Sequence, residues 1–306
     1  MDFVNVVTEY GIRQLPLPIR AGVAPSYLWL PPGAWSNVLT FLTAYFPHVA
    51  ADTWMARMSR GEVVDEHGVR LGPDSPCRKG MCIFYYREIE DETPIPFEET
   101  VLYRDAHILV ADKPHFLPVI PSGRFLRETL LVRLRSRFGL DHLTPIHRID
   151  RETAGVVIFS HNLATRGCYQ SLFQQRAVDK VYEALAPAAE HLRFPLVRHS
   201  RMVEGEPFFC MREVEGEPNS ETHIDVVASG DRTTLYRLMP VTGKKHQLRV
   251  HMAGLGIPIV NDVFYPVALP CKGDDVSLPL KLLARSVSFR DPLTGEERHF
   301  RSDRAL

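Results

Sequence analysis

The residues best suited to chemistry form a short charged stretch in the middle of the chain. Residues 147–155 have the sequence HRIDRETAG, which places Asp150 between Arg148 and Arg151. The apolar run 156–159 follows, and such a run beside a glycine is typical of a buried strand. An aspartate flanked by arginines is either a structural ion-pair node or a carboxylate that is held ionised for a reaction. The stretch alone leaves both interpretations open.

Two further stretches carry side chains that could bind a phosphate or a base. Lys180 and Tyr182 alternate along a predicted strand. Residues 243–251 have the sequence GKKHQLRVH, whose cationic candidates are Lys244, Lys245, His246 and Arg249. A tyrosine ring can stack on a planar base, cations can bind phosphates, and an arginine can fork onto a carboxylate. Tyr182 also fits a core position and the basic segment a solvated helix start, so these residues indicate no more than a nucleotide or phosphate site.

Several common active-site patterns are absent from the sequence. It has no G-x-S-x-G turn, no P-loop, no G-x-G-x-x-G and no H-E-x-x-H. Residues 147–150 look like a kinase H-R-D loop, but the aspartate comes one residue too late and no D-F-G accompanies it. Cys77 and Cys82 are too isolated for a zinc site, which needs four well-spaced ligands.

The composition is that of a globular protein. The 306 residues are 45% hydrophobic and 24% charged, enough for one large or two ordinary domains. No apolar run approaches the ~20 residues that span a bilayer, and the N-terminus shows no signal peptide. The five cysteines are odd in number and unpatterned, which suits a reducing cytoplasm. Because the formal net charge is −1, any surface for a polyanion must be local.

The first third of the chain is predicted to form a small α/β module. The expected elements are an extended lead-in at 1–33, a helix at 38–46 capped by Ser36-Asn37, a short helix from a cap at Asp52 to Gly61, and strands at 62–64 and 81–86. The acidic, proline-punctuated stretch 88–99 is typical of a linker. We therefore place an accessory module at 1–96 and a second domain at 97–306. The module resembles the alpha-L RNA-binding motif over about residues 34–90, through residues 57–63 and Gly80.

The rest of the chain combines short strands with few helices. Expected strands lie at 101–103, 108–111, 156–159, 180–185, 233–241 and 281–289, and expected helices at 126–138, 162–178 and 244–254. Thr242 is the expected cap of the last helix, and the cations of its first turns would lie where the helix dipole favours anions. Short, unevenly spaced strands with few helices predict an α+β domain with a mixed, largely antiparallel central sheet and flanking helices.

From about residue 97 to the C-terminus the chain resembles the RluA-type pseudouridine synthases. Residues 147–155 are similar to the family motif HRLDRxTSG, residues 180–182 to KxY, and residues 242–251 to TGRxHQLRVH. Residues 101–114 resemble the opening motif YED…vvnKP, and residues 256–265 resemble GhPIlGDxxY. The motifs follow one another in the order of the family.

The resemblance implies an isomerase that converts uridines of structured RNA, ribosomal or transfer, to pseudouridine. Asp150 would be the catalytic aspartate, paired with Arg249. Tyr182 would stack on the flipped uracil and assist proton removal at C5. Arg148 would replace the extruded uridine in the RNA stack, because the reacting atoms of a stacked base are out of reach. Arg151 is left with a structural role. Asp150 could attack C1′, attack C6 or remove a ribose proton, and the resemblance leaves all three open.

The resemblance also implies the partners of the protein. RNA contacts are expected of Arg148 and of Lys180, Lys244, Lys245 and His246. Since an isomerisation neither oxidises nor hydrolyses, we expect no metal and no cofactor, and we expect a monomer without a membrane partner. Two alternatives remain, a non-catalytic RNA-binding protein that keeps the fold and a nucleotide hydrolase that uses Asp150. The joint presence of Asp150, Tyr182 and Arg249 favours the isomerase.

Overall fold

The structure is a computed structural model that describes residues 15–33, 35–89, 91–269 and 275–306. The chain divides into two compact units, Met1–Glu92 and Thr93–Leu306. The division comes four residues before the predicted one, because Ile95 already belongs to the second unit. Its N–H donates to Glu128 (2.8 Å) and its carbonyl accepts from Arg133 (2.7 Å). The first fourteen residues of the predicted lead-in lie outside the described residues.

The N-terminal unit combines a small sheet with two helices. Its elements are β1 (Ser26–Trp29), α2 (Val38–Tyr45), α3 (Ala51–Ser59), β2 (Val63–Asp65) and β3 (Cys82–Tyr85), and the antiparallel strand order is β1-β3-β2. Asn37 caps α2 as predicted, because its side chain accepts from the Thr40 N–H at 2.8 Å. The predicted Asp52 cap of α3 was wrong, whereas the predicted helix itself is present. Ala50 occupies the N-cap and Asp52 lies inside the first turn, where its charge suits the helix dipole.

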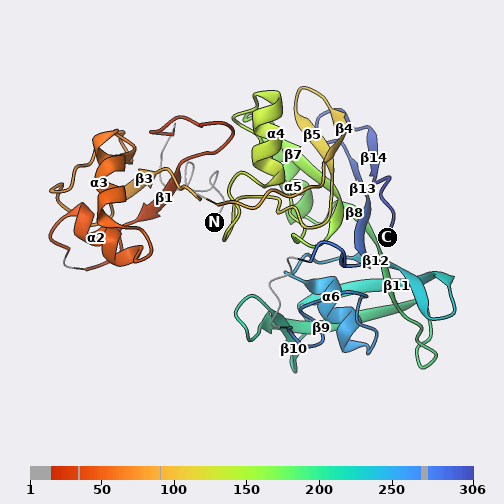
Figure 1. Ribbon diagram of the computed structural model, residues 1–306. Coiled ribbons are helices and arrows are strands. Elements are labelled where there is room, and N and C mark those ends of the chain that lie inside the picture. Colours follow the sequence, from red (N-terminus) through yellow and green to blue (C-terminus); the bar gives the residue numbers. More distant parts are fainter. Residues whose placement is uncertain (1–14, 34, 90, 270–274) are drawn as a thin grey trace. The chain divides into compact units, whose positions relative to one another are not determined.

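The C-terminal unit contains the remaining elements, which Figure 1 shows in yellow to blue. They are β4 (Thr100–Arg104), β5 (Ile108–Lys113), α4 (Leu130–Phe138), β6 (Thr144–Pro145), β7 (Ala154–Ser160), α5 (Arg166–Gln174), β8 (Asp179–Pro187), β9 (Leu196–Glu204), β10 (Met211–Val214), β11 (Ser220–Ser229), β12 (Thr233–Pro240), α6 (Gln247–Gly254), β13 (Leu282–Arg290) and β14 (Glu297–Arg301). Across the described part of the chain, no helix is long and apolar enough to cross a membrane.

One large sheet organises this unit and confirms the predicted α+β class. Its strand order is β10-β9-β11-β12-β8-β13-β7-β5-β4, with β14 paired to β13 and β6 to β7. Among the strands that the structure describes, β7 and β13 form the parallel pair and the other pairs are antiparallel. Gly155 permits that pairing, because its φ is +116° and a Cβ there would overlap the Ala284 carbonyl oxygen.

Strands β5 and β7 are buried along their whole length, and their central residues are apolar because helices cover both of their faces. Alternate residues point to opposite sides of a sheet. One set packs against α4, namely Leu109, Ala111, Val157 and Phe159. The other set packs beside Tyr169 of α5, namely Ile108, Val110, Val156 and Ile158. This rigid double layer supports the loop that ends at β7, which carries Asp150.

Helix α6 begins later than the sequence suggested. His246 adopts a left-handed conformation (φ 55°) at the N-cap, so Lys244 and Lys245 precede the helix. The predicted Thr242 cap was wrong, because the Thr242 hydroxyl instead donates to Gln247 Oε1 at 2.6 Å. The Gln247 amide in turn donates to the carbonyl of Glu221 (2.9 Å). A buried glutamine therefore fixes the turn that enters α6.

Candidate active site

A buried lysine, Lys113, fixes the loop that carries Asp150. Lys113, at the end of β5, has no exposed surface, and its ammonium donates to three carbonyl oxygens. These belong to Pro114 (2.9 Å), Leu117 (2.8 Å) and Arg151 (3.0 Å). Arg151 donates through Nε to the Phe116 carbonyl at 3.1 Å. Two cationic side chains thus fix the backbone next to Asp150 rather than facing a substrate.

Arg249 of α6 lies at the centre of the acidic groups of the site. Its Nε and Nη2 donate to the two carboxylate oxygens of Asp262 at 2.8 and 2.7 Å, in the forked geometry that suits this pair. Both side chains are only 1% exposed. Burial opposes the charge of Arg249, but the hydrogen bonds and the charge of Asp262 outweigh it and raise the pKa of the guanidinium. The arginine is therefore a permanent, fixed cation.

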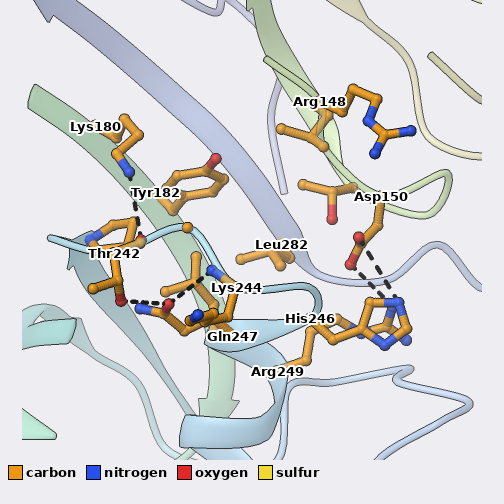
Figure 2. Close-up of a pocket in the computed structure, with 15 residues that line it drawn as sticks. Arg148, Asp150, Lys180, Tyr182, Thr242, Lys244, His246, Gln247, Arg249 and Leu282 are labelled. Atoms are coloured by element: carbon orange, nitrogen blue, oxygen red, sulfur yellow. Dashed lines mark hydrogen bonds and ion pairs between the residues drawn. The ribbon is translucent and has the colours of Figure 1, made fainter. Parts of the chain in front are cut away.

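The remaining guanidinium nitrogen faces Asp150. Arg249 Nη1 lies 3.3 Å from Asp150 Oδ2 and 3.8 Å from Glu152 Oε2. Asp150 keeps a quarter of its side chain exposed, whereas Glu152 keeps 12%. Figure 2 shows the Asp150 carboxylate pointing toward His246 and Arg249 at one side of the pocket. Of the three carboxylates around Arg249, Asp150 is thus the one most open to a substrate.

His246 contacts Asp150 from the other side. Its Nε2 lies 3.8 Å from Asp150 Oδ1, and its Nδ1 lies 2.8 Å from the Tyr265 hydroxyl. That hydroxyl accepts a hydrogen bond from the Met211 N–H at 2.8 Å and shares a second hydrogen bond with Nδ1. Burial lowers the pKa of His246, although Asp150 opposes the effect. Burial thus favours the neutral imidazole, whose Nε2 faces Asp150.

Strand β8 contributes Lys180 and Tyr182, which share one face because they are two residues apart. Figure 2 shows both side chains at the pocket wall opposite Asp150. The Lys180 ammonium donates to the Thr242 carbonyl at 3.5 Å, and burial lowers its pKa. Burial, reinforced by the charge of Asp150, raises the pKa of Tyr182. The phenol therefore stays protonated and offers a ring face and a hydroxyl donor.

These side chains line one open pocket, whose space of about 520 Å³ includes the solvent at its mouth. The predicted site residues in its lining are Arg148, Asp150, Lys180, Tyr182, Lys244, His246 and Arg249. Lys245 lines the adjoining groove, which shares Asp150 and Tyr182 with the pocket. Arg148, Lys244 and Lys245 are exposed. The structure thus brings all the predicted residues into one cleft.

Sequence reasoning missed three residues that shape this site. Asp262 holds Arg249, Tyr265 orients His246, and Gln247 fixes the entry to α6. The first two lie in the segment 256–265, which matched a family motif but had received no role. His147, in the central motif, is structural: its Nε2 accepts from the Ile158 N–H at 3.2 Å, and burial lowers its pKa to about 3.

Comparison with known proteins agrees with the geometry. The family model of the RNA pseudouridylate synthases matches residues 107–254. The dual-specificity RNA pseudouridine synthase RluA of Vibrio vulnificus is 32% identical over 206 residues, 63% of this chain and 78% of the relative. RluA of Haemophilus ducreyi is 30% identical over 226 residues, 70% of this chain and 97% of the relative. The structure of human RNA pseudouridylate synthase domain containing 1 has a TM-score of 0.55 at 24% identity, covering 68% of this chain and 84% of that one.

The chain therefore belongs to the RluA-type RNA pseudouridine synthases. It is an isomerase that converts uridine in RNA to pseudouridine, and the human structure supports the same fold.

Proposed function

We propose that Asp150 is the carboxylate that acts on the target uridine. The observation that carries the proposal is the contrast among the acids around Arg249. Asp262 is 1% exposed and doubly bonded to the arginine, and Glu152 is 12% exposed. Asp150 is a quarter exposed and makes one longer contact, at 3.3 Å. Arg249 therefore stabilises the charge of Asp150 and leaves part of the carboxylate accessible from the pocket.

The chemistry requires the base to leave and rejoin its ribose. The bond between N1 and C1′ breaks, the uracil turns within the pocket, C5 bonds to C1′, the C5 proton leaves, and N1 gains a proton. Tyr182 supplies a ring face against the uracil and limits where it can turn. Because the raised pKa keeps the Tyr182 phenol protonated, it is a poor proton acceptor. We therefore assign removal of the C5 proton to Asp150, with Tyr182 orienting the base.

The target nucleotide must be extruded from its strand, since the pocket floor is reached only by a base outside the stack. Arg148 is exposed two residues before Asp150 and lines the pocket, so we assign it the space that the uridine vacates. We assign Lys244 and Lys245, both exposed, to the RNA phosphates, with Lys180 deeper in the groove. His246 is 8% exposed and its burial favours the neutral form, which suits positioning Asp150 better than binding a phosphate.

The proposed substrates are specific uridines in structured ribosomal or transfer RNA of the cytoplasm, modified by a monomer. Pseudouridine mapping of total RNA tests this in three strains: one with the gene, one without it, and one that carries Asp150→Asn. We expect sites that are present in the first strain and lost from the other two. Sites that persist with Asp150→Asn but are lost without the gene would refute the role of Asp150. Sites that persist in all three strains would leave RNA binding as the function of the cleft.

We further propose that the N-terminal unit selects the RNA class. Its likeness to the alpha-L motif supports this, while catalysis needs only residues of the C-terminal unit. Deletion of residues 1–92 should leave isomerisation of total RNA measurable and change the ratio of modified ribosomal to transfer RNA sites. An unchanged ratio would assign the unit a purely structural role.

A further inference from the structure

A line of aromatic rings runs from the active site to the surface. His246, beside Asp150, stacks on Phe264 with ring centroids 5.8 Å apart and planes inclined by 27°. The ring centroids of Phe264 and Phe209 are 5.2 Å apart, and those of Phe209 and Phe208 are 5.5 Å apart. His246 is the N-cap of α6, Phe264 lies in the segment after α6, and Phe208 and Phe209 lie in the loop between β9 and β10. The tertiary fold rather than the local sequence therefore brings these rings together. We call these four residues the aromatic track.

The outer end of the track is open. Phe208 is 85% exposed, the highest value among the large apolar side chains that the structure describes. Phe209 and Phe264 are half-buried and pack against the cluster of Met202, Cys210, Val250 and Tyr265. The inner rings are thus fixed by the core, while Phe208 presents its surface to solvent. Phe208 therefore offers an accessible π-face to a ligand.

Two cationic side chains, Lys245 and Arg249, lie near the inner end of the track. Lys245 is exposed, directly precedes His246, and lines the groove that contains Asp150. Arg249 also lies over the Phe264 ring, 4.8 Å from its centroid. Lys245 therefore places an exposed cation at the inner end of the track, beside His246. Aromatic rings combined with cations are the arrangement that binds single-stranded nucleic acid.

We propose that the aromatic track binds unpaired nucleotides of the substrate RNA that neighbour the extruded uridine, with one base stacked on Phe208. Extrusion of a nucleotide disturbs the stacking of its neighbours. The exposed Phe208 ring, which is connected to His246 of the pocket through Phe209 and Phe264, can replace the lost stacking partner. A second copy of this chain fits less well. One exposed ring flanked by the exposed Glu204, Glu206 and Pro207 falls far short of the roughly 800 Å² per partner of a stable interface.

Binding of a short RNA tests the proposal without reference to catalysis, so its outcome is independent of the role assigned to Asp150. The probe is a fluorescein-labelled oligouridylate of twelve nucleotides, and the readout is fluorescence anisotropy with the full-length protein. Phe208→Ala should weaken binding by at least about five-fold, the loss expected for one stacked base. Phe208→Tyr keeps the ring and should bind within about two-fold of the wild type.

Two controls separate stacking from other effects. An abasic oligomer of the same length offers phosphates without bases, and Phe208→Ala should bind it as well as the wild type does. Leu163→Ala removes another exposed apolar side chain (60%) that does not line the cleft, and should leave oligouridylate binding unchanged. Since Phe208 packs so little, its substitution should not shift the unfolding temperature.

Three results would overturn the proposal. Phe208→Ala could bind oligouridylate as tightly as the wild type, or lose affinity equally for the abasic oligomer. The wild type could also fail to prefer the oligouridylate over the abasic oligomer. A change in sedimentation of Phe208→Ala without any change in RNA affinity would identify the ring as a contact between copies of this chain instead.

Discussion

Replacing Asp262 with asparagine should destabilise the protein far more than the same change at Asp150. Asp262 is 1% exposed and accepts two hydrogen bonds from Arg249, at 2.7 and 2.8 Å. It also accepts from the N–H groups of Phe264 (2.9 Å) and Tyr265 (3.2 Å). An asparagine can keep one oxygen toward the guanidinium, but its amide N–H groups then face the other guanidinium N–H. The substitution leaves Arg249 buried without its main counter-charge.

Loss of one partner from a buried ion pair costs about 3–5 kcal/mol. Because Asp150 and Glu152 still face Nη1 at 3.3 and 3.8 Å, we expect the lower end, about 3 kcal/mol, for Asp262→Asn. For a unit of this size about 1 kcal/mol corresponds to roughly 2–4 °C, so the unfolding temperature should fall by about 6–12 °C. Asp150→Asn breaks one longer, partly exposed contact, which is worth about 0–1 kcal/mol.

Thermal unfolding followed by circular dichroism measures both variants under one set of conditions. The comparison uses the shift in unfolding temperature, since a chain of two units need not unfold in one step. Below its transition, Asp262→Asn should still bind RNA but turn over slowly, because Arg249 no longer has a fixed position. Equal unfolding temperatures for the two variants would refute the assignment of Asp262 as the anchor of Arg249.

Two further substitutions probe the cleft and its support. Arg148→Ala should lower the isomerisation rate at least about ten-fold, whereas Arg137→Ala, a control at an exposed position of α4, should leave the rate unchanged. Neither substitution should change the free energy of unfolding by more than about 0.5 kcal/mol. Equal isomerisation rates for the two variants would remove Arg148 from the site. Burial lowers the pKa of His251 to about 4 from 6.5, so the unfolded state binds a proton that the folded state refuses, and stability falls as the pH drops from 6.5 toward 4. In His251→Asn the free energy of unfolding should depend less steeply on pH, by up to about 1.4 kcal/mol per pH unit. Denaturation curves at several pH values measure this slope, and an unchanged slope would contradict the burial of a neutral imidazole.

The fold class and the strand positions could be predicted because the pattern of apolar residues is strong. The run 156–159 and the alternation at 180–185 both lie within observed strands, β7 and β8. Helix ends were predicted less well. The predicted helix at 126–138 begins only at Leu130, because the buried Thr129 takes the cap position and accepts from the Val132 N–H. Turn geometry that depends on tertiary contacts, such as the left-handed His246, has no such periodic signal.

The candidate site could be assembled from sequence only as far as the family motifs reach. Asp150, Tyr182 and Arg249 come from three elements whose proximity depends on sheet topology, and the resemblance supplied it. The predicted pair of Arg249 and Asp150 is present at 3.3 Å, but it is one contact among several. Asp262 forms the shorter, two-point contact, and a single sequence holds no measure of which of several acids faces an arginine. The aromatic track likewise joins residues that are far apart in the chain.

Release of tritium from uridine C5 tests the role of Asp150 most directly. The substrate is total RNA labelled with 5-tritiated uridine, taken from cells that lack the gene, so no target needs to be known. Formation of the carbon–carbon glycosidic bond must free the hydrogen at C5. The wild-type protein should release tritium to water in proportion to the sites modified. Asp150→Asn should release none above background while it binds the same RNA within about three-fold of wild-type affinity. Release by Asp150→Asn at the wild-type rate would contradict the assignment of Asp150 as the catalytic carboxylate.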